Sequence, residues 1–156
     1  MDQIVLKTKI GKIAVHYQDN FVIKVQQVIN QVRATTKNDP LAIEIQKQFS
    51  AYFSGELKEF NLPFLFHQGT DYQLKVWDQI RNISYGSTKT YGEISKKIKS
   101  GPRAVGNACR CNQLLLLVPC HRVVSAVGLG GFLGDADGSL ARRKQWLLDH
   151  EQENVS

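Results

Sequence analysis

Residues 90–110 read TYGEISKKIKSGPRAVGNACR, and this stretch is the most informative about the fold. Its first four residues have the spacing of a capping box, which begins a short helix that we expect to end near Ile98. A tight turn follows, and Pro102 suits the first position of a second helix that continues to about Arg110. A short helix, a tight turn and a basic helix in this order are typical of a helix-turn-helix.

The sequence on both sides of this motif extends it into a mainly helical carboxy-terminal domain, which we place at residues 67–156. Upstream, a second capping box at 70–73 begins an amphipathic helix. Downstream, the apolar run 114–118 is predicted to be a buried strand that leads into Pro-Cys-His-Arg-Val at 119–123. A glycine-rich loop comes next. The last helix is expected to span 139–151 and to turn Leu140, Leu147 and Leu148 inward.

The amino-terminal part has a different pattern and predicts an α/β domain over residues 1–66. Apolar and polar side chains alternate along 3–28, so this segment is predicted to form a β-meander of three strands. A helix is expected to begin with Asp39 as its N-cap and to end at Gly55. The segment 57–68 is interpreted as a linker or an edge strand held by apolar side chains.

The charge of the chain is unevenly distributed. The net charge is +6, and the isoelectric pH is about 9.3. Between Arg81 and Arg122 the one acidic residue is Glu93, and six basic residues surround it: Lys89, Lys96, Lys97, Lys99, Arg103 and Arg110. Such a local excess can bind a polyanion such as nucleic acid, although a solvated basic face is the plainer alternative.

The composition, with 42% apolar and 22% charged residues, indicates a soluble globular protein. We find no apolar run long enough for a membrane span and no secretory signal at the start, so we expect no membrane contact and a cytoplasmic location. The three cysteines are odd in number and clustered, which favours free thiols over a disulfide framework. Cys109 and Cys111 lie two residues apart. Because no second pair accompanies them, we interpret them as small unpaired residues and predict no metal.

Cys120 and His121 form the strongest candidate for a chemical centre. A thiolate is a much better nucleophile than a thiol, and a neighbouring histidine can remove the proton directly or through one water. Neighbouring side chains on an extended segment point apart, so their contact requires a bend, which Pro119 could help to impose. On its own, a Cys-His dipeptide is more often a buried structural pair.

A longer set of motifs decides between these alternatives. The segment 119–123 resembles the active-site motif of the O6-alkylguanine-DNA alkyltransferases, also called methylated-DNA–protein-cysteine methyltransferases. The resemblance covers the whole second domain in the same order and the first domain loosely. It extends through Gly69-Thr70, Val76-Trp77, Tyr85-Gly86, Thr90-Tyr91-Gly92-Glu93-Ile94, Arg103-Ala104-Val105-Gly106, Asn112, and Trp146-Leu147-Leu148-Asp149-His150-Glu151.

This resemblance implies a catalytic role for five residues. Cys120 is expected to accept the alkyl group, His121 to deprotonate it through a water, and Glu151 to orient His121. Asn112 corresponds to the hinge asparagine that braces the turn before the cysteine. Tyr91 corresponds to the residue that rotates the target phosphate and helps to protonate the departing guanine.

The resemblance also implies a surface for DNA and a pocket for the base. Arg103 is expected to enter the base stack in place of the flipped nucleotide, and small residues on the same helix let it approach the minor groove. The DNA-binding candidates are Arg103, Tyr91, Ala104, Gly106, Arg110 and Lys89. The pocket candidates are Val123, Phe132, Lys144 and Pro119, and the carbonyls of Cys120 and Val123 are expected to face the guanine amino group.

The function that the resemblance implies is DNA repair by direct reversal of damage. The alkyl group of O6-alkylguanine, and also of O4-alkylthymine, would move to Cys120 in a single irreversible turnover that needs no cofactor. The partner would be double-stranded DNA, bound through the minor groove with little sequence preference by a monomer. The implied fold is an RNase H-like amino-terminal domain packed on a winged-helix-like carboxy-terminal domain.

Two alternatives and several departures remain at this point. A non-catalytic lesion-binding protein of the alkyltransferase-like kind carries tryptophan at the cysteine position, and Cys120 argues against it. A hydrolase that uses Cys120, His121 and Glu151 would turn over repeatedly. The departures from the family pattern are Gln113 in place of proline, Leu133 in place of serine, Cys109 and Cys111 on the second helix of the motif, and a long loop at 128–138.

Overall fold

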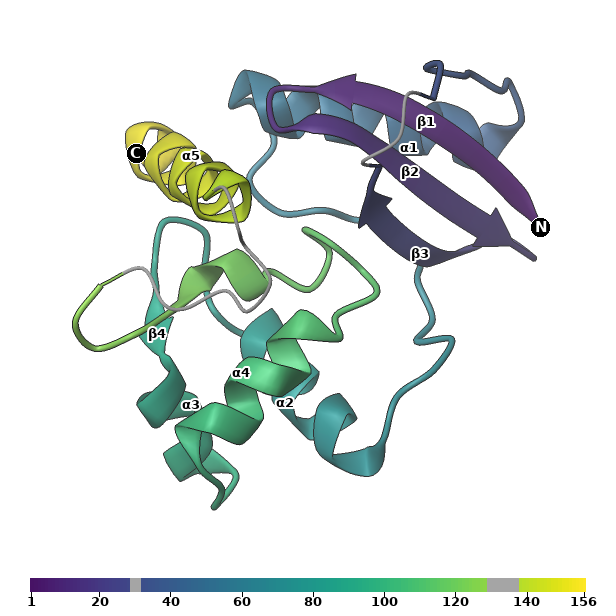
Figure 1. Ribbon diagram of the computed structural model, residues 1–156. Helices are drawn as coiled ribbons and strands as arrows, with labels where there is room; N and C mark the ends of the chain where they lie inside the picture. The colour runs from purple at the N-terminus through teal and green to yellow at the C-terminus, as the bar shows by residue number, and fades with distance from the viewer. Residues whose placement is uncertain (29–31, 129–137) are drawn as a thin grey trace. The chain divides into compact units, whose positions relative to one another are not determined.

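The computed structural model describes residues 1–28, 32–128 and 138–156 (Figure 1). These residues form two compact units. The amino-terminal unit consists of Met1–Gln68 with Gln113–Leu115, and the carboxy-terminal unit consists of Gly69–Asn112 with Leu116–Ser156. None of the helices in the described ranges combines the length and the apolar character that a membrane span requires.

The amino-terminal unit is built on an antiparallel sheet in which β1 (Asp2–Thr8), β2 (Gly11–Gln18) and β3 (Phe21–Gln27) lie in sequence order. The predicted β-meander is therefore confirmed. Ile4 lies opposite Val15, and Val15 lies opposite Val25, each no more than 1% exposed. The alternation of the sequence thus gives the three strands a shared row of buried side chains.

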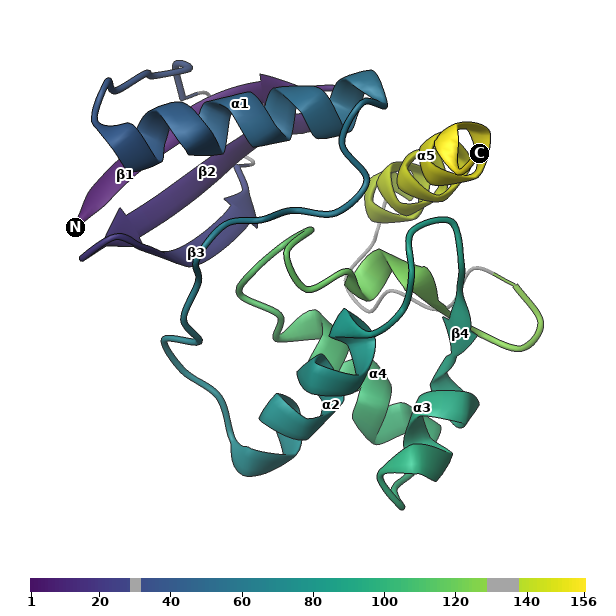
Figure 2. The same ribbon diagram turned by 180° about the vertical axis from the view of Figure 1, so that it is seen from behind.

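Helix α1 (Pro40–Ser54) covers one face of this sheet, as Figures 1 and 2 show from opposite sides. The side chain of Asp39 accepts a hydrogen bond from the backbone N–H of Ala42, and its Oδ1 accepts a second from the hydroxyl of Tyr17 at 2.7 Å. Gly55 ends the helix in the left-handed conformation, with φ 88°. The expected helix and both of its caps are confirmed, and the Tyr17 bond links the cap to β2.

Two further segments pair with β3 at single positions. The segment 57–68, interpreted as a linker or an edge strand, pairs at Phe64 with Val22, whose backbone N–H donates to Pro63 at 2.8 Å. Leu114 pairs in the same parallel sense with Val25. Each pairing is an isolated bridge, so neither segment forms a named strand.

Three helices of the carboxy-terminal unit match the sequence prediction. They are α2 (Asp71–Arg81), α3 (Tyr91–Lys97) and α4 (Pro102–Arg110). The capping boxes of Thr70 and Thr90 are both complete, because in each the side chain at the third helical position also binds back to the cap. Trp77 is fully buried on α2 and donates its indole N–H to the carbonyl of Ala108 on α4 at 2.9 Å.

The predicted strand at 114–118 is wrong. These residues are apolar and largely buried, but the backbone turns at Leu116, where φ is 71°. An apolar run indicates burial and does not by itself specify an extended backbone. Among the described residues of this unit the strands are β4 (Lys89–Thr90) and β5 (Val123–Val124), a short parallel pair that the sequence did not indicate.

Helix α5 (Ser139–Asn154) closes the described chain and extends slightly beyond its expected end. Its buried residues are Lys144, Leu147, His150 and Glu151. Leu140, which was expected to face inward, is 37% exposed. The inward face of α5 is therefore largely polar, which a hydrophobic periodicity cannot show.

Gly86→Ala is predicted to destabilise the protein by about 2–4 kcal/mol. Gly86 has φ 80°, and a Cβ added there would lie 2.4 Å from a methyl carbon of Val155. Gly128→Ala is the matched control, because no neighbouring atom lies within 4 Å of its added Cβ. Urea unfolding measures both free energies, and equal values for the two variants would contradict the close packing of Gly86 against Val155.

Candidate active site

Cys120 begins a short 3-10 helix, η1 (Cys120–Arg122), that follows the bend at Pro119. The backbone N–H of Cys120 donates to the carbonyl of Val118 at 2.8 Å. The side-chain amide of Asn112 donates to the same carbonyl at 2.9 Å and also hydrogen-bonds the thiol of Cys120. Asn112 thus braces the turn that presents the cysteine, in the position expected of it.

Glu151 is fully buried and holds the two residues that follow the cysteine. Nε2 of His121 lies 2.7 Å from Oε2 of Glu151. Nε and Nη2 of Arg122 donate to the two carboxylate oxygens at 2.8 and 3.0 Å, and Nη1 donates to the carbonyl of Ile83 at 2.7 Å. The carboxylate therefore binds an imidazole and a guanidinium at the same time, and the guanidinium also lies over the ring of Tyr85.

The charges of this group follow from burial and from these hydrogen bonds. Burial alone would raise the pKa of Glu151, but the hydrogen bonds from His121 and Arg122 outweigh it and hold the pKa well below the ordinary value of a carboxyl. Burial lowers the pKa of His121 despite the opposing effect of Glu151. The imidazole is therefore neutral near neutral pH. Since a carboxylate only accepts, Nε2 carries the proton.

This tautomer leaves Nδ1 of His121 as an unprotonated nitrogen. Nδ1 is buried, and no hydrogen-bond partner for it occurs among the described residues. A neutral imidazole whose far nitrogen is fixed by a carboxylate is the arrangement of a general base. His121 is therefore prepared to accept a proton at Nδ1.

Tyr91 and Lys144 lie together near the cysteine. The ammonium of Lys144 donates to the carbonyl of Val123 at 2.5 Å and to the hydroxyl oxygen of Tyr91 at 3.4 Å. Burial lowers the pKa of Lys144 to about 8, although the nearby Cys109 and Cys120 oppose this shift. Burial and the same two thiols raise the pKa of Tyr91 to about 12. Tyr91 is therefore a protonated hydroxyl that accepts from a lysine and has its own proton to donate.

A second thiol affects the acceptor candidate. Cys109, in the last turn of α4, interacts electrostatically with the thiol of Cys120. This interaction lowers the pKa of Cys109 and, together with burial, raises that of Cys120 well above its ordinary value, because one negative charge on the pair opposes a second. In the resting site Cys120 is therefore a thiol, whose proton has to be removed as it reacts.

The remaining predicted residues are spread over α4 and its surroundings. Arg103 and Arg110 are exposed near the two ends of α4, Ala104 and Gly106 are partly exposed between them, and Lys89 is exposed on β4. Gly106 faces the ring of Tyr91, whose Cε1 would lie 3.9 Å from an added Cβ. Phe132 lies outside the described residues, as do Leu133 and most of the loop at 128–138.

Two residues of the site were not predicted from the sequence. Arg122 was quoted in the motif without a role, and the structure makes it the second partner of Glu151. Cys109 was interpreted as an unpaired small residue, and its thiol influences the pKa of Cys120. The charge of Arg122 within an otherwise apolar segment was the one available signal, since a buried cation requires a partner.

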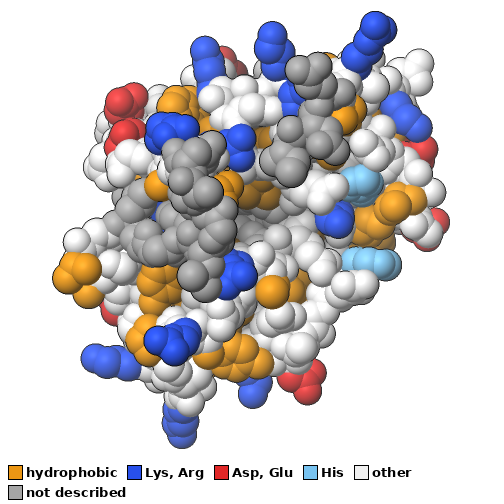
Figure 3. Space-filling model, in the orientation of Figure 1, with side chains coloured by type: hydrophobic (Ala, Val, Ile, Leu, Met, Phe, Trp, Pro, Cys, Tyr) orange, Lys and Arg blue, Asp and Glu red, His pale blue; other side chains and the backbone are white. Residues whose placement is uncertain are grey.

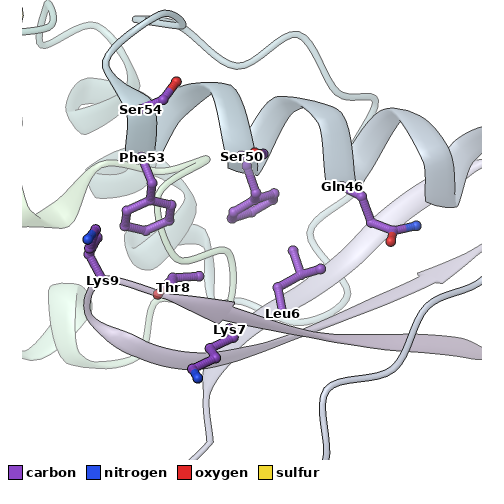
Figure 4. A pocket seen from close by; sticks show the side chains of 9 residues that line it. Leu6, Lys7, Thr8, Lys9, Gln46, Ser50, Phe53 and Ser54 are labelled. Atoms are coloured by element: carbon purple, nitrogen blue, oxygen red, sulfur yellow. The ribbon is translucent and has the colours of Figure 1, made fainter.

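A pocket of a different kind lies in the amino-terminal unit between α1 and the end of β1 (Figure 4). Its lining residues are Leu6, Lys7, Thr8, Lys9, Gln46, Phe49, Ser50, Phe53 and Ser54. None of these nine is a cysteine, histidine or carboxylate, and the pocket includes none of the predicted site residues. The described part of the chain also contains no cluster of three or more histidine, cysteine, aspartate or glutamate residues that could hold a metal ion.

Comparisons with known proteins point to one family. Residues 71–153 match the family model described as 6-O-methylguanine DNA methyltransferase, DNA binding domain. The chain is 43% identical over 104 residues to the methylated-DNA–protein-cysteine methyltransferase of Methanosarcina acetivorans, across 65% of this chain and 66% of the relative. It is 34% identical over 155 residues to a probable methylated-DNA–protein-cysteine methyltransferase of Acanthamoeba polyphaga mimivirus, across 97% of both chains.

A solved structure is similar over nearly the whole chain. The crystal structure of Mycobacterium tuberculosis OGT in complex with DNA matches with a TM-score of 0.81 and 34% identity, covering 96% of this chain and 92% of that one. The similarity therefore includes the mixed α/β fold as well as the sequence motifs.

Glu151→Gln is predicted to destabilise the protein by about 3–5 kcal/mol, because it leaves the buried guanidinium of Arg122 without an opposite charge. Glu153→Gln makes the same chemical change at an exposed position of α5 and is expected to alter stability by less than about 0.5 kcal/mol. Chemical denaturation at neutral pH compares the two variants with the wild type. Equal, small losses would show that the buried ion pair contributes little.

The effect of Glu151→Gln is also predicted to depend on pH. The pKa of Glu151 is lowered in the folded protein, so its charge stabilises the fold fully above the ordinary value of 4.5, and this contribution is lost as the pH falls toward the lowered value. The difference in unfolding free energy between wild type and variant should therefore shrink as the pH is lowered below 4.5. A difference that stays constant across this range would contradict the assigned charge.

Proposed function

The chain belongs to the 6-O-methylguanine DNA methyltransferase family, and on that premise we propose that it repairs DNA by moving the alkyl group of O6-alkylguanine irreversibly onto Cys120. One observation supports this assignment above the others. The partly exposed Cys120 adjoins His121. Nε2 of this histidine is held by the buried carboxylate of Glu151, and its Nδ1 is unprotonated. A neighbouring base of this kind can deprotonate a thiol as it reacts and so make it a nucleophile.

The reaction follows from the positions of three groups. Nδ1 of His121 takes the thiol proton of Cys120, through one water, and Glu151 stabilises the resulting imidazolium. The Cys120 sulfur then attacks the alkyl carbon and the bond between that carbon and O6 breaks. The departing guanine oxygen takes a proton from the hydroxyl of Tyr91. Lys144, which donates to that hydroxyl, favours the release of its proton.

The product explains the single turnover. A thioether at Cys120 is stable, and the alkyl group comes from the DNA itself, so the reaction uses no dissociable cofactor and consumes the protein. O4-alkylthymine offers the same kind of alkyl–oxygen bond and is proposed as a second substrate.

DNA is proposed to bind over α3 and α4. Several lysine and arginine side chains project over these helices in the lower part of Figure 3. Arg103 is exposed at the first turn of α4, where it can enter the base stack, while the partly exposed Ala104 and Gly106 leave room for the minor groove. Lys89 and Arg110 would bind phosphates, so binding should depend little on sequence and should weaken with salt.

Finer features are proposed on the same basis. We propose that the pocket for the extruded base is lined by Pro119, Phe132, Lys144 and the carbonyl of Val123. Extrusion of the base from the stack costs a few kcal/mol. The domains are proposed as 1–66, RNase H-like, and 67–156, winged-helix-like. We further propose that the protein acts as a monomer in the cytoplasm.

Incubation with a duplex that contains O6-methylguanine is predicted to add one methyl group per protein, at Cys120. Intact-protein mass spectrometry with fragment-ion mapping measures both the number and the position. Cys120→Ala is expected to bind the duplex and gain no mass, while Cys111→Ala, which removes an exposed thiol, should be methylated like the wild type. Loss of the lesion with unmodified protein would indicate hydrolysis instead, and binding without loss of the lesion would indicate a lesion-binding protein.

Tyr91→Phe is predicted to slow methyl transfer by about 10²-fold or more, because it removes the proton donor for the leaving guanine. Tyr72→Phe is the matched control, since the hydroxyl of Tyr72 bonds the side chain of Ser100 at 2.8 Å and none of the proposed catalytic residues. Single-turnover rates with the methylated duplex compare the two. An unchanged rate for Tyr91→Phe would assign the proton to another donor.

A further inference from the structure

We propose that the pocket between α1 and the end of β1 binds a small aromatic carboxylate, a ligand with a flat apolar body and one negative charge (Figure 4). All nine residues that line the pocket belong to the amino-terminal unit, whereas Cys120 belongs to the carboxy-terminal unit. Binding of such a ligand is therefore an activity beyond the alkyl transfer.

The pocket has the size of a small-molecule site. Its volume is about 470 Å³, and ligand pockets in proteins usually measure about 300–1,000 Å³. Its lining combines apolar side chains with a few polar groups, which is the usual composition of such sites. The space is sufficient for a ligand of one or two rings together with its charged group.

Apolar side chains from both elements form a wall for the rings of the ligand. Leu6 extends from β1 toward α1, and Phe53 extends from α1 toward the strand, as Figure 4 shows. Phe49 is buried and packs on Phe60 with ring centroids 4.8 Å apart. Phe53 meets the ring of Tyr52 edge-on, with centroids 5.2 Å apart. Because neighbouring rings hold both phenylalanines, the wall is formed before a ligand arrives.

The charged side chains of the pocket are all positive. The lining contains Lys7 and Lys9 and neither aspartate nor glutamate. Lys9 is exposed and lies beside Phe53 in Figure 4. Within the part of the chain that the structure describes, no ion pair joins Lys9 to an acidic residue. An ammonium without a protein counter-ion, next to an aromatic wall, favours a ligand with a negative charge.

The backbone of Lys7 provides a second donor. Val5 donates its N–H to the hydroxyl of Thr35 and accepts from the N–H of Thr35, each at 3.0 Å, so the polar groups of Val5 point away from β2. These directions alternate along an antiparallel strand, so the N–H of Lys7, two residues later, also points outward from β2. Figure 4 shows the side chain of Lys7 pointing away from α1. The backbone N–H is therefore the group of Lys7 that can bind a ligand.

Most other polar side chains of the pocket are already bonded within the protein. The hydroxyl of Thr8 accepts from one backbone group and donates to another in the turn between β1 and β2. The hydroxyl of Ser54 donates to a carbonyl of α1, and the amide of Gln46 donates to two backbone carbonyls. The two lysine donors remain for the ligand. Because both are donors, the ligand has to present acceptors, and a carboxylate has two oxygens that only accept.

Binding is tested on the full chain with 2-naphthoate, followed by the ¹H and ¹⁵N amide shifts in NMR spectra. The expected Kd is about 1 mM or tighter, with the largest shifts at residues 6–9 and 46–54. 2-Naphthamide has the same rings and no charge, and it should bind at least about 5-fold more weakly. Equal binding of the two compounds, no saturable shift at millimolar concentrations, or shifts confined to other residues would overturn the assignment.

Two lysine variants test the charge. Lys9→Gln should weaken the binding of 2-naphthoate by about 5- to 10-fold and leave that of 2-naphthamide unchanged, because it removes the ammonium alone. Lys47→Gln is the matched control, since Lys47 is exposed on α1 and does not line the pocket, and its Kd should equal that of the wild type. Equal Kd values of 2-naphthoate for the two variants would contradict the role of Lys9.

Phe53→Ala tests the apolar wall. It should weaken the binding of 2-naphthoate and of 2-naphthamide by the same factor, because both compounds present the same rings to Phe53. Urea unfolding checks that the variant is folded, and the lysine variants at exposed positions test the site independently of that result. Unchanged Kd values for a folded Phe53→Ala protein would place the rings elsewhere and overturn the assignment.

Discussion

The site depends on the buried carboxylate of Glu151. A lone charge in the interior would be very costly, and here both oxygens are occupied by charged or polar donors from the segment that follows Cys120. Arg122 neutralises the carboxylate, and its third contact, with the carbonyl of Ile83, extends the network to the segment that follows α2. His121 is thereby oriented by an ion pair that exists independently of it. The same interaction stabilises the fold and fixes the base.

Cys120 and His121 differ in protonation between the resting site and the reacting site. Interaction with Cys109, together with burial, keeps Cys120 protonated, and the neutral imidazole of His121 has an open nitrogen for that proton. A protein that is consumed by one reaction benefits from a thiol that is not permanently ionised, because thiolates also react with oxidants and with free alkylating agents. The short β4–β5 pairing contributes as well, since it places Tyr91 and Val123 where Lys144 can bind both.

The sequence predicts the elements well and the polar contacts less well. Capping boxes at Thr70 and Thr90, Pro102 and the alternation of 3–28 located the helices and strands correctly, because these signals are local. The apolar run at 114–118 led to a wrong prediction, because buried residues give the same apolar pattern whether or not their backbone is extended. Arg122 pairs with a residue of α5 and Cys109 interacts with a residue of η1, both distant in the chain, and Leu140 faces solvent because polar residues occupy the inner face of α5. No periodicity encodes such pairings.

The most direct test of the central claim is the protonation state of His121. Nitrogen NMR of the protein with ¹⁵N-labelled histidine distinguishes the two neutral tautomers and the cation, and His121→Ala identifies the signals among the four histidines. We predict a neutral ring at neutral pH, with the proton on Nε2 and a free Nδ1, and a change of this state in Glu151→Gln. A ring protonated on Nδ1, or a spectrum unaffected by Glu151→Gln, would contradict it.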